Sequence, residues 1–263
     1  MKIDKVKKPI GQTIWFKIVL TILIFIPSIT QISYDTANTT NVIAEVMAHP
    51  LVTSIPALLP IAKLLLLVAT VVPFCNVKFA NKIFMGYYAL ILLIVGILQN
   101  MANTNSYGFV WLIGNTLVQF VVATYCIYDI AKQKSIFKIQ HLNNNRLWVL
   151  IPMLLAFLMP YSVNAQGIVK PAFTFDIFLN EAGVTYCMIT PVVLCVMIVF
   201  SKGIYKPLLS VVSYVGFMFG LLNMMTWFAM QNQNWWMGVI HLPLLILSFY
   251  GLVISKKEKE TLG

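Results

Sequence analysis

The sequence predicts an all-α integral membrane protein of eight transmembrane helices, arranged as two tandem four-helix repeats. Three observations support this fold class: few charged residues, eight long apolar segments, and basic residues that alternate with those segments. Of the 263 residues, 60% are apolar and only 10% are charged, whereas soluble domains carry about 25% charged residues. So few charges cannot cover a water-facing surface, which places the chain among membrane proteins.

The first element is a span that begins after the basic residues 1–8. A helix needs about 20 apolar residues to cross the hydrocarbon core, and eight segments approach that length. No small-residue cleavage site follows Pro27, so we interpret the first segment as a retained helix and not as a signal peptide. The predicted spans are residues 15–33, 54–75, 83–102, 109–130, 147–163, 184–201, 207–229 and 235–254.

The basic residues orient these spans. Every Lys and Arg except Lys63 and Lys170 lies at or before the start of span one, after span eight, or between spans two and three, four and five, or six and seven. The positive-inside rule makes that side cytoplasmic, so we expect a cell-membrane protein with both termini inside. The net charge of +10 then reflects topology and not nucleic-acid binding. It also predicts that anionic lipids of the bilayer gather at the cytoplasmic face.

The two halves of the chain repeat a pattern. Lys, Gly, Met and Trp residues recur at a spacing of 124 positions without a gap, and the first spans match at a spacing of 133. We expect a four-helix repeat at residues 1–134 and another at 135–263, parallel and related by a pseudo-two-fold axis along the membrane normal. The matched pairs include Lys78 and Lys202, Gly96 and Gly220, Gln99 and Asn223, Trp111 and Trp235, and Pro27 and Pro160.

Lys63 is the one clear charge inside a predicted span. Ionisable groups in the membrane are costly and suggest function, so Lys63 is a candidate for binding an anionic part of a substrate or for pairing with Glu45, Asp176 or Glu181. The alternative is that its four-carbon stem lets the ammonium group reach the nearby outer interface. The sequence leaves both open.

Polar residues near the outer ends of other spans form the rest of the candidate binding site. The site would lie between the two repeats, with Gln99 and Asn223 at symmetric places. Each of these side chains has an alternative role in a hydrogen bond between helices. The candidate substrate-binding residues are Gln99, Asn100, Asn115, Asn223, His241 and Lys63.

Catalytic and metal-binding motifs are lacking in the sequence. We find no HExxH, GxSxG or paired intramembrane carboxylates, and the three His residues fall in separate predicted regions. We therefore predict no catalytic residue, no metal and no cofactor. Gly216 and Gly220 form a GxxxG motif, which predicts close helix packing within the fold or in a homo-oligomer.

Three functions fit these features. The first is a small-solute transporter or channel with a polar site between the repeats near the outer face. The second is a non-catalytic membrane subunit, such as an anchor, assembly or immunity factor, that docks to a partner protein. The third is a quinone- or lipid-directed membrane enzyme, which rests on architectural analogy alone.

Overall fold

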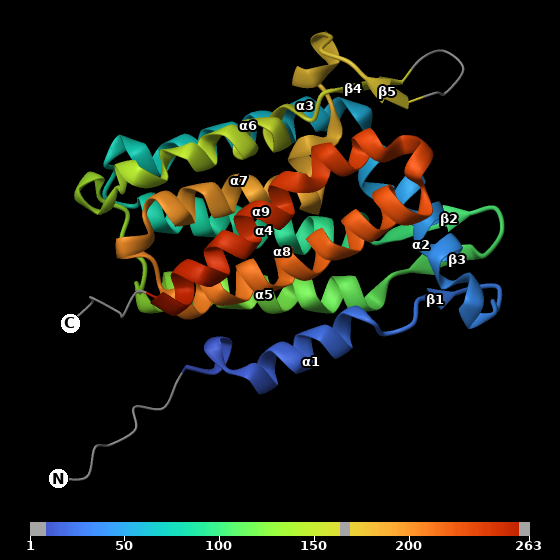
Figure 1. The fold of residues 1–263 in the computed structure, drawn as a ribbon, viewed down its shortest axis with the longest axis horizontal. Coiled ribbons are helices and arrows are strands. Elements are labelled where there is room, and N and C mark those ends of the chain that lie inside the picture. The colour runs from blue at the N-terminus through green and yellow to red at the C-terminus, as the bar shows by residue number, and fades with distance from the viewer. Residues whose placement is uncertain (1–8, 164–168, 258–263) are drawn as a thin grey trace.

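The structure is a computed structural model that describes residues 9–163 and 169–257. In these ranges the fold is nearly all-α, with nine α-helices and five short β-strands (Figure 1). The short strands are the departure from the all-α prediction. The α-helices are α1 (Ile14–Ile24), α2 (Thr39–Ala48), α3 (Leu59–Val71), α4 (Ala80–Leu98), α5 (Ile113–Lys132), α6 (Leu150–Leu158), α7 (Tyr186–Val199), α8 (Lys206–Met224) and α9 (Trp235–Lys257).

Five helical segments are long and apolar enough to cross a membrane, and a sixth span results if the bent pair Phe175–Val184 and Tyr186–Val199 counts as one. The apolar helical segments Ile14–Ile24 and Asn144–Leu158 are shorter. The chain is therefore compatible with a multi-pass membrane protein, and eight crossings stay a prediction. The five long segments are Pro56–Cys75, Ala80–Leu98, Ile113–Lys132, Lys206–Met230 and Asn232–Lys257.

Several helices end earlier than the apolar segments that predict them. Helix α1 ends at Ile24 although the predicted span runs to residue 33, and α6 ends at Leu158 although its span runs to residue 163. Pro27 and Pro160 follow these ends, and proline removes a backbone donor and clashes with the preceding helical turn. Hydropathy shows that a segment is apolar but does not show where the helix within it stops.

The segments beyond these helix ends form β-structure at one end of the bundle, which we call the strand end (Figure 1). Strands β1 (Ile29–Thr30), β2 (Met101–Thr104) and β3 (Gly108–Trp111) pair antiparallel in the order β1-β3-β2. Gly108 adopts a φ of +65° at the start of β3, a conformation that glycine tolerates best. A second hairpin pairs β4 (Tyr161–Val163) with β5 (Val169–Pro171).

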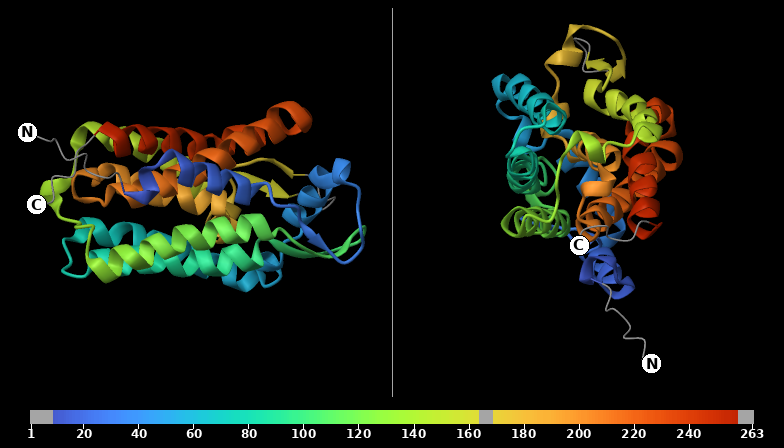
Figure 2. Two further views of the ribbon diagram at one scale, coloured as in Figure 1. Left: turned by 90° about the horizontal axis from the view of Figure 1, so that it is seen from below. Right: turned by 90° about the vertical axis from the view of Figure 1, so that its left-hand side faces the viewer.

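Helix α7 lies at the centre of the bundle (Figure 2). All of its residues except Cys187 are buried, and it contacts α3, α4, α6, α8 and α9. A helix that is apolar on all sides is buried on all sides, so this segment forms the core and the other helices surround it. The opposite end of the bundle, which we call the basic end, holds both described ends of the chain (Figure 1).

Helices α8 and α9 pack closely through small residues. A Cβ atom added to Gly220 would lie 2.9 Å from the backbone Cα of Leu245, and one added to Gly216 would lie 2.3 Å from the Ser248 hydroxyl oxygen. The GxxxG pair of α8 thus faces α9 within the same chain. Small residues at such positions let two helix backbones approach.

The two halves share part of their contact pattern. Helix α1 contacts α5 as α6 contacts α9, α3 contacts α4 as α7 contacts α8, and α4 contacts α5 as α8 contacts α9. Helices α3 and α7 hold matching places in the two halves but differ in their surroundings. Helix α7 in addition contacts α6 and α9 and lies in the core, whereas α3 exposes one face rich in leucine. The internal duplication stays a prediction, and any two-fold relation would be broken at α3 and α7.

Candidate functional site

Lys63 lies inside the protein and not at its surface. The side chain is only 3% exposed, and its ammonium group donates to the Asn180 side-chain oxygen at 2.6 Å and to the carbonyl oxygens of Ile177 and Leu158. The Phe157 ring lies 5.1 Å from the same nitrogen. A buried ammonium group needs such acceptors because its desolvation is otherwise uncompensated. We call Lys63, Leu158, Ile177 and Asn180 the Lys63 cluster.

The Lys63 cluster joins the two predicted halves of the chain. Helix α6 ends at Leu158, with Met159 in the left-handed conformation at its C-cap. The Asn180 amide donates to the carbonyl oxygens of both residues, at 2.9 and 3.0 Å. Because a helix C-terminus carries partial negative charge, an ammonium group is favourable there. Lys63 of α3 therefore holds the end of α6 and the loop that follows it.

Gly183 makes this arrangement possible. It belongs to the 3₁₀ helix Glu181–Val184, which packs against α3. A Cβ atom at position 183 would lie 2.4 Å from the Lys63 backbone nitrogen and 2.5 Å from the Ala62 carbonyl carbon. Only glycine permits two backbones to approach so closely. The Lys63 ammonium group donates its hydrogen bonds to neutral oxygens.

Gln99 and Asn223 both contact the first turn of α7. The Gln99 side-chain oxygen accepts a hydrogen bond from the Tyr186 backbone N–H at 2.9 Å. The Asn223 amide donates to Cys187 Sγ at 3.3 Å and to the Phe219 carbonyl oxygen at 2.8 Å. The first N–H groups of a helix lack partners within the helix, so Gln99 supplies one. The two amides thus position α7 from two neighbouring helices.

Asn100 and His241 also bond to nearby backbone. Asn100 donates to the Gly96 carbonyl oxygen at 3.0 Å. His241 Nδ1 lies 2.7 Å from the Met237 carbonyl oxygen, and its ring lies 5.9 Å from that of Trp227. The structure therefore does not gather the predicted polar residues around one opening.

Asn115 differs because it lines a recess. This recess, of about 240 Å³, lies where the end of α1 meets α2 and α5. Thr36, Thr39 and Ser28 add polar groups to a mainly apolar lining. The recess belongs to the first half of the chain and not to the boundary between the halves.

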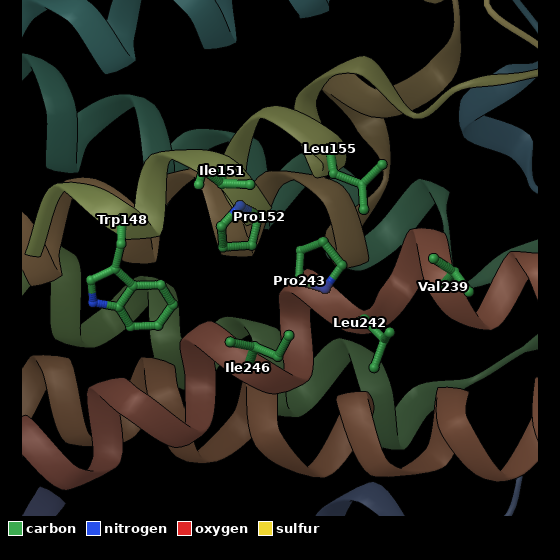
Figure 3. A pocket seen from close by; sticks show the side chains of 8 residues that line it. All are labelled: Trp148, Ile151, Pro152, Leu155, Val239, Leu242, Pro243 and Ile246. Carbon is green, nitrogen blue, oxygen red and sulfur yellow. The ribbon is translucent and has the colours of Figure 1, made fainter.

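A second opening is an apolar groove between α6 and α9 (Figure 3). It encloses about 270 Å³, with Trp148, Ile151, Pro152 and Leu155 on the α6 side. Ile151 is 76% exposed, so the groove opens to the outside of the bundle. Figure 3 shows the α9 side chains opposite, which are Val239, Leu242, Pro243 and Ile246.

Comparison with known proteins finds no family model, no curated protein and no solved structure that matches the chain.

Within residues 9–163 and 169–257, no group of three or more His, Cys, Asp or Glu side chains could hold a metal ion. Sequence reasoning did not single out Asn180 or Gly183. The available signal was weak: an Asn four residues before a predicted span, in a segment that also contains glycine, which is typical of a helix cap or turn.

Proposed function

We propose that this chain is a non-catalytic, multi-pass membrane subunit that docks to a partner protein through the α6–α9 groove. The occupant of the groove is a membrane-spanning helix of that partner. The observation that carries the proposal is an open groove lined entirely by apolar side chains from α6, the 3₁₀ helix before it and α9. A third helix packs into such a surface by placing its side chains between those of its neighbours.

The short length of α6 supports a helix as the occupant. Helix α6 has 9 residues and follows a 3₁₀ helix of 6 residues, Asn144–Val149. Together they extend about 25 Å, against a hydrocarbon core of about 30 Å. A helix that is too short for the bilayer is accommodated by local thinning or by association with other helices. A partner helix beside α6 removes this mismatch.

The packed centre of the bundle supports docking over transport. Helix α7 fills the middle with buried apolar side chains, and Gln99 and Asn223 bond to its first turn. Polar groups that are engaged with backbone cannot exchange hydrogen bonds with a passing solute without leaving those partners unpaired. The surface of the bundle is then the place for interaction.

Photo-crosslinking in native membranes tests the proposal. A photoreactive residue at Ile151, in the groove, should give a discrete adduct with one other protein. The matched control is the same residue at Ile127, which is 51% exposed. Ile127 belongs to α5, and helices α5 and α6 lie on opposite sides of the bundle (Figure 1). Adducts of equal yield at both positions, or adducts with lipid alone, would refute docking at the groove.

A small-solute transporter is the second candidate, and the recess around Asn115 favours it. The recess offers side-chain oxygen and nitrogen atoms in an otherwise apolar wall, which is typical of small-molecule sites. A thermal-stability screen of polar solutes in detergent tests it. Stabilisation by one solute that is lost on Asn115→Leu, with uptake of that solute into proteoliposomes, would establish transport. Absence of any binding or uptake would remove the candidate.

A further inference from the structure

A short helical segment crosses the strand end of the bundle at a right angle. Residues Phe175–Val184 meet α7 at an angle of 88°, whereas the long helices run beside α7 along the bundle (Figure 1). Helices that cross a membrane are tilted from its normal by only about 20° on average. Residues 175–184 therefore lie close to the plane of the membrane, which is the orientation of an interfacial segment.

One side of this segment carries exposed phenylalanine rings. Phe175 and Phe178 are 72% and 54% exposed, and their ring centres lie 5.7 Å apart. They are the first and last residues of a 3₁₀ helix, in which side chains three residues apart lie one above the other. Phe173, two residues before this helix, is 78% exposed. The three rings present apolar surface whose contact with water is unfavourable.

The other side of the segment is fixed to the bundle. The carbonyl oxygen of Ile177 and the side-chain oxygen of Asn180 accept hydrogen bonds from Lys63. Gly183 lies against the backbone of α3. Because these contacts hold the segment in place, the phenylalanine rings cannot turn toward the core without breaking them.

The position of the rings matches the edge of the bilayer. Residues 169–179 project sideways from the bundle, beyond α3 and α6 (Figures 1 and 2). Helices α3 and α6 themselves expose apolar side chains such as Leu64 and Ile151, which suit contact with lipid. The turn between β2 and β3 projects instead along the axis of the bundle (Figure 1). Lipid around α3 and α6 therefore reaches the phenylalanine rings, whereas the β2–β3 turn points into water.

We propose that Phe173, Phe175 and Phe178 insert into the bilayer at the strand end and anchor residues 173–179 at its interface. The occupant of this apolar surface is the lipid bilayer in which the chain itself lies. Interfacial segments bury their apolar side about 5–10 Å deep, at the boundary between headgroups and acyl chains. The anchor lies on a different surface from the α6–α9 groove, and its existence does not depend on a partner protein.

Nitroxide labels on the purified full-length chain in phosphatidylcholine liposomes test the anchor. The labelled variants are Phe175→Cys, Phe178→Cys, Asp176→Cys and Ser106→Cys. Each is made together with Cys75→Ser, because Cys75 is exposed, and the Cys75→Ser chain alone is the labelling blank. Electron paramagnetic resonance measures collisions of each label with oxygen, which concentrates in lipid, and with a nickel chelate, which stays in water.

Ser106 is the matched control, since it is exposed in the turn between β2 and β3. Labels at Phe175 and Phe178 should collide with the nickel chelate about tenfold less often than the label at Ser106, because burial of one phenylalanine ring favours the inserted position by about that factor. Their collisions with oxygen should be more frequent. The label at Asp176 should be closer to Ser106 in both values, because it points a third of a turn away.

Two results would overturn the proposal. Nickel-chelate collisions at Phe175 and Phe178 that equal those at Ser106 would place the rings in water. Infrequent collisions with both reagents would show that protein and not lipid covers the rings, as in contact between two copies of the chain. Unfolding temperatures equal to that of the Cys75→Ser chain would show that the labelled variants are folded.

Discussion

The substitution Gly183→Ala should destabilise the protein strongly through a clash of one methyl group with backbone. The added Cβ atom would lie 2.4 Å from the Lys63 nitrogen and 2.5 Å from the Ala62 carbonyl carbon. Favourable carbon contacts begin near 3.5 Å, so the two segments must separate by about 1 Å. Neither obstacle is a movable side chain, because both atoms belong to the backbone of α3.

We expect a loss of about 3 kcal/mol, at the upper end of the cost of overpacking. The separation also stretches the hydrogen bonds that the Lys63 ammonium group donates, and a bond from a charged donor contributes about 1.5–3 kcal/mol. In thermal unfolding of the purified protein in detergent, this corresponds to a decrease in Tm on the order of 10 °C.

Gly86→Ala is the matched control. Gly86 lies within α4, and the nearest atom to an added Cβ is Ile130 Cδ1 at 3.9 Å. Alanine should therefore be tolerated, and it can stabilise the helix by about 0.5–1 kcal/mol. If Gly183→Ala unfolds at the same temperature as wild type while Gly86→Ala behaves as expected, the close approach of the loop to Lys63 is wrong.

Three further substitutions test the contacts described above, each by unfolding in detergent. Lys63→Met removes the donor of the Lys63 cluster, so we expect the free energy of unfolding to fall by about 2 kcal/mol and residues 172–180 to be cleaved faster by protease. Unchanged proteolysis would show that Lys63 does not hold this segment. Gln99→Leu leaves the Tyr186 N–H without its acceptor and should cost about 1 kcal/mol, and wild-type stability would exclude a capping role. Gly220→Ala should cost about 2 kcal/mol and more than Gly216→Ala, because it meets the backbone of α9 while the latter meets a rotatable hydroxyl; the reverse order would contradict the packing of α8 on α9.

Hydropathy predicted the helical membrane class because long apolar segments have few other stable forms. A helix lies within or across every predicted span. The helix ends were less predictable, since residues 101–102 and 109–111 belong to two predicted spans yet form part of a β-hairpin. The local composition of β3 does not predict that it pairs with β1, because β1 comes from a distant part of the chain.

The surroundings of Lys63 could not be predicted from the sequence. Its acceptors are a side-chain amide and carbonyl oxygens that lie 95 to 117 residues further along the chain. Carbonyl oxygens are present in every residue and give no sequence signal. The sequence-based interpretations were a substrate contact, a pairing with Glu45, Asp176 or Glu181, and a reach to the outer interface. None of them included the Asn180 amide or a backbone carbonyl oxygen as the partner.

The central position of α7 has a consequence for how natural variation in this chain should be interpreted. Surface helices accept one apolar residue for another because lipid adapts to their shape. Helix α7 is instead enclosed by five helices, whose packed side chains do not adapt in this way. Substitutions within Tyr186–Val199 should therefore be the least tolerated in a saturation screen, although the segment bears no charged residue. If the residues of α7 do not vary, the reason is the close packing of their side chains in the core. Such invariance should not be interpreted as evidence that α7 lines a pathway for a substrate.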